Sequence, residues 1–444
     1  MLLQFSVKNF KTFKDKATLS LIASNYDKDT RETENVFNDM KFNFRLLKSA
    51  VVYGANASGK SKFLEAIAFM RYFVINSFKE TQEGDTIGVE PFLLSAETEN
   101  KPSEFEIIFV FNGELFRYGF EVTTKEIVSE WLYHKPKTKE IELFYRDRDE
   151  FETHEKKFTK GSMVVKGKLV RDNALLISVA AQFNETTAIT VINWFKRLKF
   201  ISGLNESGYH GFTMGKTENP IQKMKILELL KAADFNIQDL KLQKLDIDKI
   251  PKGMPKEIRD EILREMREEN TEFIADVLTT HKKFDLNKQV TGNVNFSLDD
   301  DESSGTRKFF ALTGPILDVI ENGYTLVVDE LDSKLHPNLV SKIVSLFNSK
   351  EFNKKNAQLV FNTHDTNLLS SGLFRRDQIW FTDKNKYGEA KLYSLANFKS
   401  DEVKKNESFE ENYIKGKYGA IPYLVLFDNL NLNVSQYENE EQKS

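Results

Sequence analysis

The sequence predicts an α/β protein in which an antiparallel β lobe and a parallel sheet are separated by a helical insertion. Three observations predict it. Apolar runs of strand length dominate the 444-residue chain up to about position 180. Helical spacing of apolar residues replaces them after position 186. From position 296, short apolar strands alternate with amphipathic helices, which is the rhythm of a parallel sheet.

The first part of the chain is expected to form the antiparallel lobe. Leu3, Phe5 and Val7 alternate with polar residues as in a half-buried strand, and residues 17–23 offer a second strand. Asn112-Gly113 separates two apolar runs and tolerates the positive φ angles of a two-residue hairpin turn. Further strands are expected at 127–133, 141–145 and 174–179.

A phosphate-binding loop is predicted between the apolar run 50–53 and a helix that begins at Lys60. The residues Gly54-Ala-Asn56-Ala57-Ser58-Gly59-Lys60-Ser61 fit G-x-x-x-x-G-K-[ST] in the strand-to-helix setting that this motif requires. Glycine lets the backbone approach a polyphosphate closely, and the helix start offers N–H groups to its oxygens. Lys60 would reach the β- and γ-phosphates, and the Ser61 hydroxyl would face Mg²⁺.

Two carboxylates end a later buried strand. Asp329 and Glu330 follow the apolar run 325–328, where burial would be costly unless they face a cation at the strand's carboxyl end. Asp329 would hold Mg²⁺, and Glu330 would act as general base toward water. Alone this pair of carboxylates is weak evidence for a metal site, because acidic residues also cap helices that follow strands.

Two more motifs flank this strand. Ser303, Ser304 and Gly305 open a helix expected at 306–320, which gives a second helix start suited to phosphate. His364 directly follows the strand expected at 358–361. A lone histidine there is more often a loop residue, so its weight depends on the other motifs.

Taken in this order, the motifs resemble those of the ATP-binding cassette (ABC-type, SMC/RecF-like) ATPases, which bind ATP and Mg²⁺ between two subunits. The resemblance implies that Ser303, Ser304 and Gly305 are the signature that acts on a partner's nucleotide. Asp332 would belong to the D-loop, and His364 would be the switch histidine near the γ-phosphate. Lys11 and Thr12 would contact the nucleotide.

The residues within and around these motifs make the resemblance more specific: they resemble the OLD-like, RloA-like branch of bacterial ATPases. It rests on segments at both ends of the chain, namely Phe5-Ser-Val-Lys-Asn-Phe10, Glu302-Ser-Ser-Gly-Thr306, Asp329-Glu-Leu-Asp-Ser-Lys-Leu-His-Pro337, Gln358-Leu-Val-Phe-Asn-Thr-His-Asp365 and Tyr413-Ile-Lys-Gly-Lys-Tyr-Gly-Ala-Ile-Pro422. In this family a glutamine usually couples the bound metal to the interface between the lobes, and Gln182 is the candidate for it. Lys334 departs from the small hydroxyl residue expected at its position.

The expected domains are an N-terminal ATPase lobe at 1–185, a mainly helical insertion at 186–295, a C-terminal ATPase lobe at 296–428 and a polar tail at 429–444. Within the insertion, helices are expected at 221–233 and 256–278. An acidic row at i,i+4 spacing marks the second helix and is best explained as a solvated face: Glu257, Glu261, Glu265 and Glu269.

Composition excludes several classes of protein. The net charge of −4 argues against a surface that grips nucleic acid throughout, and zero cysteines exclude disulfides and thiolate metal sites. The start of the chain lacks the pattern of a signal peptide, and no apolar run has the length of a membrane span. A cytoplasmic location is expected.

The resemblance implies an oligomeric Mg-ATP-dependent ATPase that acts as scaffold and sensor in anti-phage abortive infection. OLD proteins often carry a Toprim nuclease after the ATPase, but the printed chain ends soon after Pro422. The toxic nuclease is therefore expected on a separate chain, as in PARIS-like or retron-associated systems, with a phage-encoded trigger. Two alternatives remain: a RecF- or SMC-like DNA-repair ATPase that binds duplex DNA, and a nucleotide-locked structural module with negligible turnover.

Overall fold

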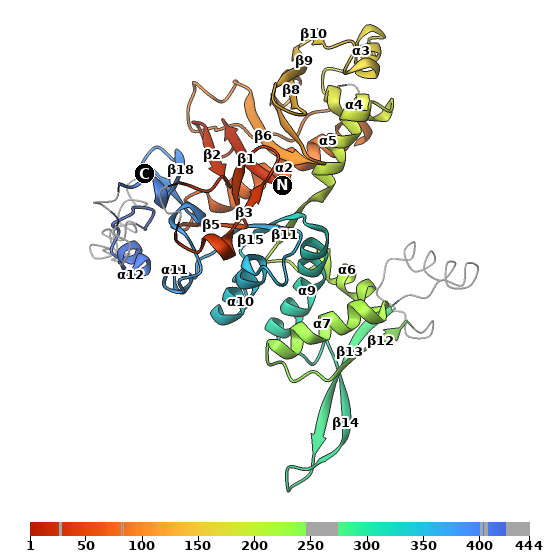
Figure 1. Cartoon of the computed structure of the whole chain (residues 1–444), viewed down its shortest axis with the longest axis vertical. Helices are drawn as coiled ribbons and strands as arrows, with labels where there is room; N and C mark the ends of the chain where they lie inside the picture. Colours follow the sequence, from red (N-terminus) through yellow and green to blue (C-terminus); the bar gives the residue numbers. More distant parts are fainter. Residues whose placement is uncertain are drawn as a thin grey trace, which may run out of the picture.

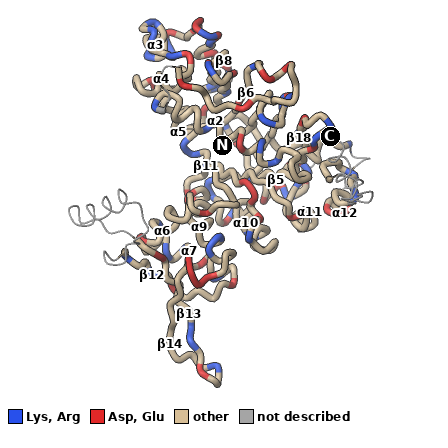
Figure 2. Tube along the Cα trace, turned by 180° about the vertical axis from the view of Figure 1, so that it is seen from behind, with Lys and Arg blue, Asp and Glu red and all other residues tan. Residues whose placement is uncertain are grey.

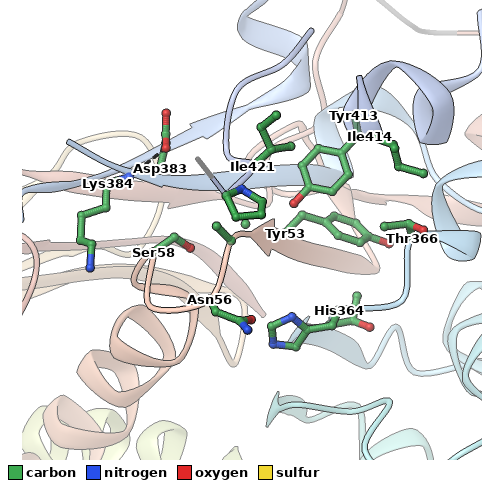
Figure 3. Close-up of a pocket in the computed structure, with 14 residues that line it drawn as sticks. Tyr53, Asn56, Ser58, His364, Thr366, Asp383, Lys384, Tyr413, Ile414 and Ile421 are labelled. Atoms are coloured by element: carbon green, nitrogen blue, oxygen red, sulfur yellow. Dashed lines mark hydrogen bonds between the residues drawn. The ribbon is translucent and has the colours of Figure 1, made fainter. Parts of the chain in front are cut away.

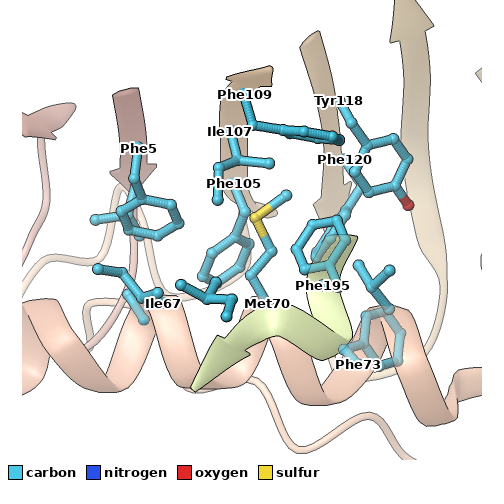
Figure 4. Close-up of a cluster of buried hydrophobic side chains, with 14 of the residues drawn as sticks. Phe5, Ile67, Met70, Phe73, Phe105, Ile107, Phe109, Tyr118, Phe120 and Phe195 are labelled. Carbon is cyan, nitrogen blue, oxygen red and sulfur yellow. The ribbon is translucent and has the colours of Figure 1, made fainter. Parts of the chain in front are cut away.

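Two large sheets enclose one long helix in the computed structural model, which describes residues 1–25, 29–80, 82, 84–245, 274–399, 403 and 407–422. The helix is α2 (Lys60–Glu80). Its apolar side chains pack in one buried cluster with residues of both sheets, including Phe5, Phe105 and Val327. Figure 4 shows the aromatic rings of the antiparallel sheet lying over α2. The phosphate loop is therefore joined to a helix that is rigidly held.

The first sheet is the predicted antiparallel lobe. Asn112 and Gly113 have φ angles of 51° and 70° and form the predicted hairpin turn. In spatial order the seven strands are β10 (Glu150–Thr153), β9 (Ile141–Asp147), β8 (Ile127–Lys135), β7 (Glu114–Val122), β6 (Ser103–Phe111), β1 (Leu2–Lys8) and β2 (Ala17–Ser20).

The second sheet is the predicted parallel sheet, with one antiparallel edge strand. Its order is β11 (Leu198–Ser202), β15 (Thr325–Asp329), β16 (Gln358–Asn362), β5 (Ser49–Gly54), β17 (Ile379–Lys384) and β18 (Ala390–Ser394). Ser202 pairs with Asp329, and Asn362 pairs with Val52. The carboxyl ends of the five parallel strands thus lie at one edge, where ligands bind in such sheets.

Helices cover the face of this sheet that α2 leaves open. Alternate residues of β5 face opposite sides, with Val52 in the α2 core and Val51 in a second core. The second core includes side chains of α9 (Ser304–Asn322), α10 (Pro337–Asn348) and α12 (Phe409–Ile414). The predicted strands and helices of the C-terminal lobe are confirmed.

The smaller elements complete the two lobes. They are α1 (Glu32–Asn35), β3 (Val36–Asp39), β4 (Phe44–Leu47), α3 (Thr159–Lys166) and α11 (Asn367–Ser370), with short 3₁₀ helices at Arg376–Gln378 and Leu395–Asn397. Within the ranges given above, no helix combines the length and apolarity needed to cross a membrane.

The strand predicted at 174–179 is wrong, because this segment forms the helix α4 (Leu176–Gln182). The buried carboxylate of Glu130 accepts hydrogen bonds from the backbone N–H groups of Leu176 and Ile177, so a side chain distant in sequence caps the helix. Five of its seven residues are buried. A helix buried on nearly all sides lacks the amphipathic spacing that would reveal it.

The mainly helical character expected for 186–295 holds only in part. Helices α5 (Thr186–Arg197), α6 (Ser207–Thr217) and α7 (Pro220–Ala232) are present, but β11 lies between them and belongs to the parallel sheet. The strands β12 (Asp239–Lys244), β13 (Ile274–Phe284) and β14 (Val290–Ser297) form a third sheet, from which the β13–β14 hairpin projects (Figure 1).

The helix predicted at 256–278 is wrong at its end, because residues from Ile274 onward pair as strand β13. Cross-strand pairing with β12 and β14 outweighs the local helical spacing there. The rest of that prediction, the acidic row of four glutamates and the polar tail lie outside the described residues.

Candidate nucleotide-binding site

The phosphate loop, Gly54 to Ser61, connects β5 to α2 as predicted. Lys60 is only 5% exposed. Its Nζ donates hydrogen bonds to the carbonyl oxygens of Gly54 (2.7 Å) and Ala55 (3.0 Å). Burial lowers the pKa of Lys60 to about 8, although the carboxylates of Glu330, Asp332 and Asp329 partly oppose this. The loop therefore holds its ammonium group at the centre of the bend.

The backbone of the loop requires its glycines. Gly59 has a φ of 114°, and a Cβ there would lie 3.0 Å from Thr12 Oγ1 and 3.1 Å from Ala390 Cβ. A Cβ on Gly54 would lie 2.5 Å from Ser58 Oγ and from the Thr382 carbonyl oxygen. The tight bend leaves Asn56 and Ala57 exposed while Ser58 is buried. The tip of the loop, at Asn56 and Ala57, is thus accessible to an anion from solvent.

Asn362 joins the phosphate loop to the carboxylates. Its side-chain amide, which is fully buried, donates to Asp329 Oδ1 at 2.6 Å and to Ser61 Oγ at 3.4 Å. Its Oδ1 accepts a hydrogen bond from the backbone N–H of Glu330. Ser61 and Asp329 are therefore held around one amide group. A hydroxyl and a carboxylate beside a phosphate site are donors that fit Mg²⁺.

The general-base candidate Glu330 has an unusual backbone. Its φ of 56° lies in the left-handed region, which is costly for residues other than glycine, asparagine and aspartate. Such strain persists only where surrounding contacts hold it. We call Asp329 and Glu330 the Asp-Glu turn.

His364 and Asp332 meet at the same edge of the sheet. The His364 backbone N–H donates to Asp332 Oδ2 at 3.2 Å, whereas Asp332 Oδ1 is buried and has no hydrogen-bond partner among the described residues. His364 also lines a cavity of about 710 Å³ with Asn56 and Tyr413. Figure 3 shows the side chains of His364 and Asn56 on the same side of this cavity. Asp332 and His364 thus lie close together beside the cavity that residues of the phosphate loop also line, and their place near a γ-phosphate stays a prediction.

The structure does not bring the signature candidate, Ser303 to Gly305, into this network. Ser303 and Ser304 are exposed at the start of α9. Ser303 Oγ accepts a hydrogen bond from the Thr306 backbone N–H at 3.1 Å. Gly305 lies against the Lys334 carbonyl, 3.0 Å from the position of a Cβ. These residues are accessible to another molecule.

Thr12 lies beside Gly59 of the loop and Lys11 pairs with a residue of α2, while contact of either with a nucleotide stays a prediction. The Lys11 ammonium pairs with Glu65 at 2.6 Å and Glu90 at 3.3 Å. Thr12 Oγ1 is buried without a hydrogen-bond partner in the described ranges, close to Gly59. Thr12 is thus the better placed of the two for a nucleotide.

The assignment of Gln182 is not supported by its position. Gln182 ends α4, whose Ser178 hydroxyl donates to the Val74 carbonyl oxygen at 2.7 Å. Val74 lies 14 residues beyond Lys60 on α2, about 20 Å along the helix axis. The helix that carries Gln182 is therefore anchored toward the end of α2 remote from the phosphate loop.

The side chain of Lys334 has a partner within the chain. Its Nζ pairs with Glu206 Oε1 at 2.9 Å and Glu206 Oε2 at 3.1 Å. A lysine can replace the expected hydroxyl residue here because Glu206 balances its charge.

Sequence reasoning missed three residues of the site. Asn362 lies two residues before His364, but an asparagine at that place is not part of any motif that the sequence matches. Thr382 contributes a hydroxyl 2.7 Å from Ser58 Oγ, and its strand β17 lies far from the loop in sequence. Gly203 donates its N–H to the Asp329 carbonyl oxygen at 2.6 Å, and it follows a strand that was expected to be part of a helical region.

The chain matches one protein family and is similar to solved structures of low sequence identity. No curated protein matches the chain. Two similar solved structures are an SMC head domain from Thermotoga maritima and an SmcHead bound to the C-winged helix domain of ScpA. Each of the two alignments has a TM-score of 0.40 and 12% sequence identity and covers 88% of this chain. They cover 98% and 97%, respectively, of the two solved chains. A family match spans residues 49–370, from β5 to α11, and the chain therefore belongs to the family described as "AAA domain, putative AbiEii toxin, Type IV TA system".

Proposed function

We propose that the chain is a Mg²⁺-dependent ATP hydrolase whose complete sites form between copies of the chain. The observation that carries the proposal is the hydrogen bonding of Asn362, which holds Ser61 and Asp329 together beside the phosphate loop. Family membership supports ATP as the nucleotide. Bound Mg²⁺ would supply charge neutralisation to the phosphate oxygens.

Each residue of the site has a distinct expected role. Lys60 leaves the loop carbonyls and donates to the terminal phosphates, which are stronger acceptors. Ser61 and Asp329 offer the oxygen ligands for the metal. Glu330 would accept a proton from the attacking water, and His364 would donate a hydrogen bond to the γ-phosphate.

The arrangement of the chain supports a shared site. Ser303 and Ser304 are exposed, and the hydrogen bond of Ser303 stays within its own helix. Asp332 Oδ1 is left without a partner at the edge of the site in the described part of the chain. A second copy would supply its signature candidate to the nucleotide held by the first, in a dimer or an assembly of dimers.

We further propose that ATP-dependent assembly controls a separate toxic effector, such as a Toprim-type nuclease, in response to a phage-encoded trigger. The family description, with its toxin and toxin–antitoxin system, supports a role in growth arrest. Continuous binding of duplex DNA is less well supported, because Figure 2 shows basic and acidic residues interspersed along most of the trace.

Glu330→Gln tests the proposal. We expect hydrolysis to fall about 100- to 10,000-fold while ATP binding persists, and light scattering after size exclusion should show an ATP-trapped oligomer. Glu228→Gln on the exposed face of α7 is the matched control.

Hydrolysis by Glu330→Gln at the rate of the unaltered protein, or an unchanged oligomeric state with ATP, contradicts the proposal. Salt-sensitive stimulation of the unaltered ATPase by duplex DNA would favour the DNA-repair alternative instead.

A further inference from the structure

A buried lysine on the signature helix contacts the segment beside the Asp-Glu turn. Lys308 lies four residues after Ser304 on α9, so both lie on one face of the helix. Its side chain is fully buried, and its Nζ donates a hydrogen bond to the Gly203 carbonyl oxygen. A buried ammonium group costs free energy, and an apolar side chain would pack α9 at lower cost.

Gly203 connects this ammonium to the catalytic carboxylates. Its N–H donates to the Asp329 carbonyl oxygen at 2.6 Å. A Cβ on Gly203 would lie only 1.9 Å from the Glu330 carbonyl oxygen, so the two backbones are in direct contact. Lys308, Gly203 and the Asp-Glu turn therefore form one continuous series of contacts.

The charges around Lys308 come from several elements. Burial lowers the pKa of Lys308 to about 8, Glu206 raises it, Lys334 lowers it, and Asp332 and Glu330 raise it. The hydrogen bond that fixes the Lys308 ammonium is nevertheless to a backbone carbonyl, not to one of these carboxylates. The position of the Lys308 ammonium group thus depends on where Gly203 lies relative to α9.

We propose that Lys308 is a positioning residue that acts through Gly203 to hold Glu330 in its left-handed conformation. This inference rests on the proposed function. When the start of α9 engages the nucleotide of a second copy, a shift of α9 moves Lys308 and Gly203 and re-aims Glu330 in its own chain. Hydrolysis at one site is thereby coupled to the engagement of the other.

Two variants test the link at different points. Lys308→Met removes the donor, and Gly203→Ala places a methyl group where the Glu330 carbonyl lies. Lys216→Met is the matched control, because Lys216 of α6 pairs with Asp318 on the same helix α9 at 3.3 Å, away from the turn.

The first readout needs no nucleotide. Hydrogen exchange of the amides of Gly203 and Glu330 should become at least about tenfold faster in Lys308→Met and Gly203→Ala, and should be unchanged in Lys216→Met. Unchanged exchange at these amides in both variants overturns the proposal. This readout remains decisive even if the unaltered protein proves not to hydrolyse ATP, which would contradict the proposed function alone.

The second readout separates positioning from general loss of structure. Both variants should lower kcat about 10- to 100-fold while KM for ATP changes by less than about threefold, because the phosphate loop is untouched. A rise in KM at constant kcat overturns the proposal. So does a fall in kcat without faster exchange at the turn.

Discussion

The side-chain amide of Asn362 donates a 2.6 Å hydrogen bond to Asp329 Oδ1. The two residues end neighbouring parallel strands, so the sheet itself places the amide beside the carboxylate. The same nitrogen lies 3.4 Å from Ser61 Oγ on the helix that follows the phosphate loop. One buried side chain thus orients both groups that we expect to hold the metal.

Asn362→Ala should weaken the use of Mg²⁺. It removes the donor to Asp329 and the acceptor of the Glu330 N–H, and loss of such outer partners typically costs about 10- to 100-fold in metal affinity or activity. ATPase rates measured against Mg²⁺ concentration should show a raised half-saturating concentration. Asn353→Ala is the control, because Asn353 is equally buried but bonds to Phe347 and Ala357. Equal Mg²⁺ curves for the two variants would contradict this role.

Gly59→Ala should strongly weaken nucleotide binding. The φ of 114° is strained for alanine, and its methyl group would press on Thr12 Oγ1 and Ala390. Titration with a fluorescent ATP analogue should show at least about a 100-fold loss of affinity, about 2.7 kcal/mol. In α6, Gly211→Ala meets no atom within 4 Å and should bind as the unaltered protein does. Tight binding by Gly59→Ala would refute the proposed geometry of the loop.

Lys48 should make stability depend on pH. Its side chain is 1% exposed, and burial lowers its pKa to about 8 from 10.5. The unfolded chain binds more protons between these values, so the folded state gains stability as pH rises from about 8 toward 10.5. Relative to Lys48→Met, the unaltered protein should gain about 2 kcal/mol between pH 7 and 9.5.

Urea unfolding of both proteins at the two pH values measures this gain. Lys342→Met on the exposed side of α10 controls for the loss of one positive charge. A stability difference between Lys48→Met and the unaltered protein that stays constant with pH would show that Lys48 is not desolvated.

Lys334→Ser should change stability little. The variant restores the small hydroxyl residue expected from the family resemblance and removes the pair with Glu206, in which Lys334 is 38% exposed. Exposed pairs contribute about 0–1 kcal/mol, so the unfolding midpoint in urea should shift only slightly. A loss of more than about 2 kcal/mol would mean that the pair acts as a buried one.

The local motifs of the site could be predicted because each depends on a short segment. Glycines at 54 and 59 and the Lys60-Ser61 pair determine the loop, and an apolar run followed by Asp329 and Glu330 determines the strand end. The Asn112-Gly113 hairpin follows from the same kind of local preference. In each case the required backbone angles or burial pattern belong to consecutive residues.

Tertiary structure decided those features that depend on contacts between residues far apart in the chain. Glu130 caps α4 and makes a helix of an apolar segment that resembles a strand. Residues after Ile274 form a strand because β12 and β14 pair with them. Gly203 and Asn362 reach the site only through sheet order. Sequence alone therefore determined where the loop and the carboxylates lie relative to their strands and helix, whereas long-range packing decided which side chains orient them, because those contacts have no local pattern.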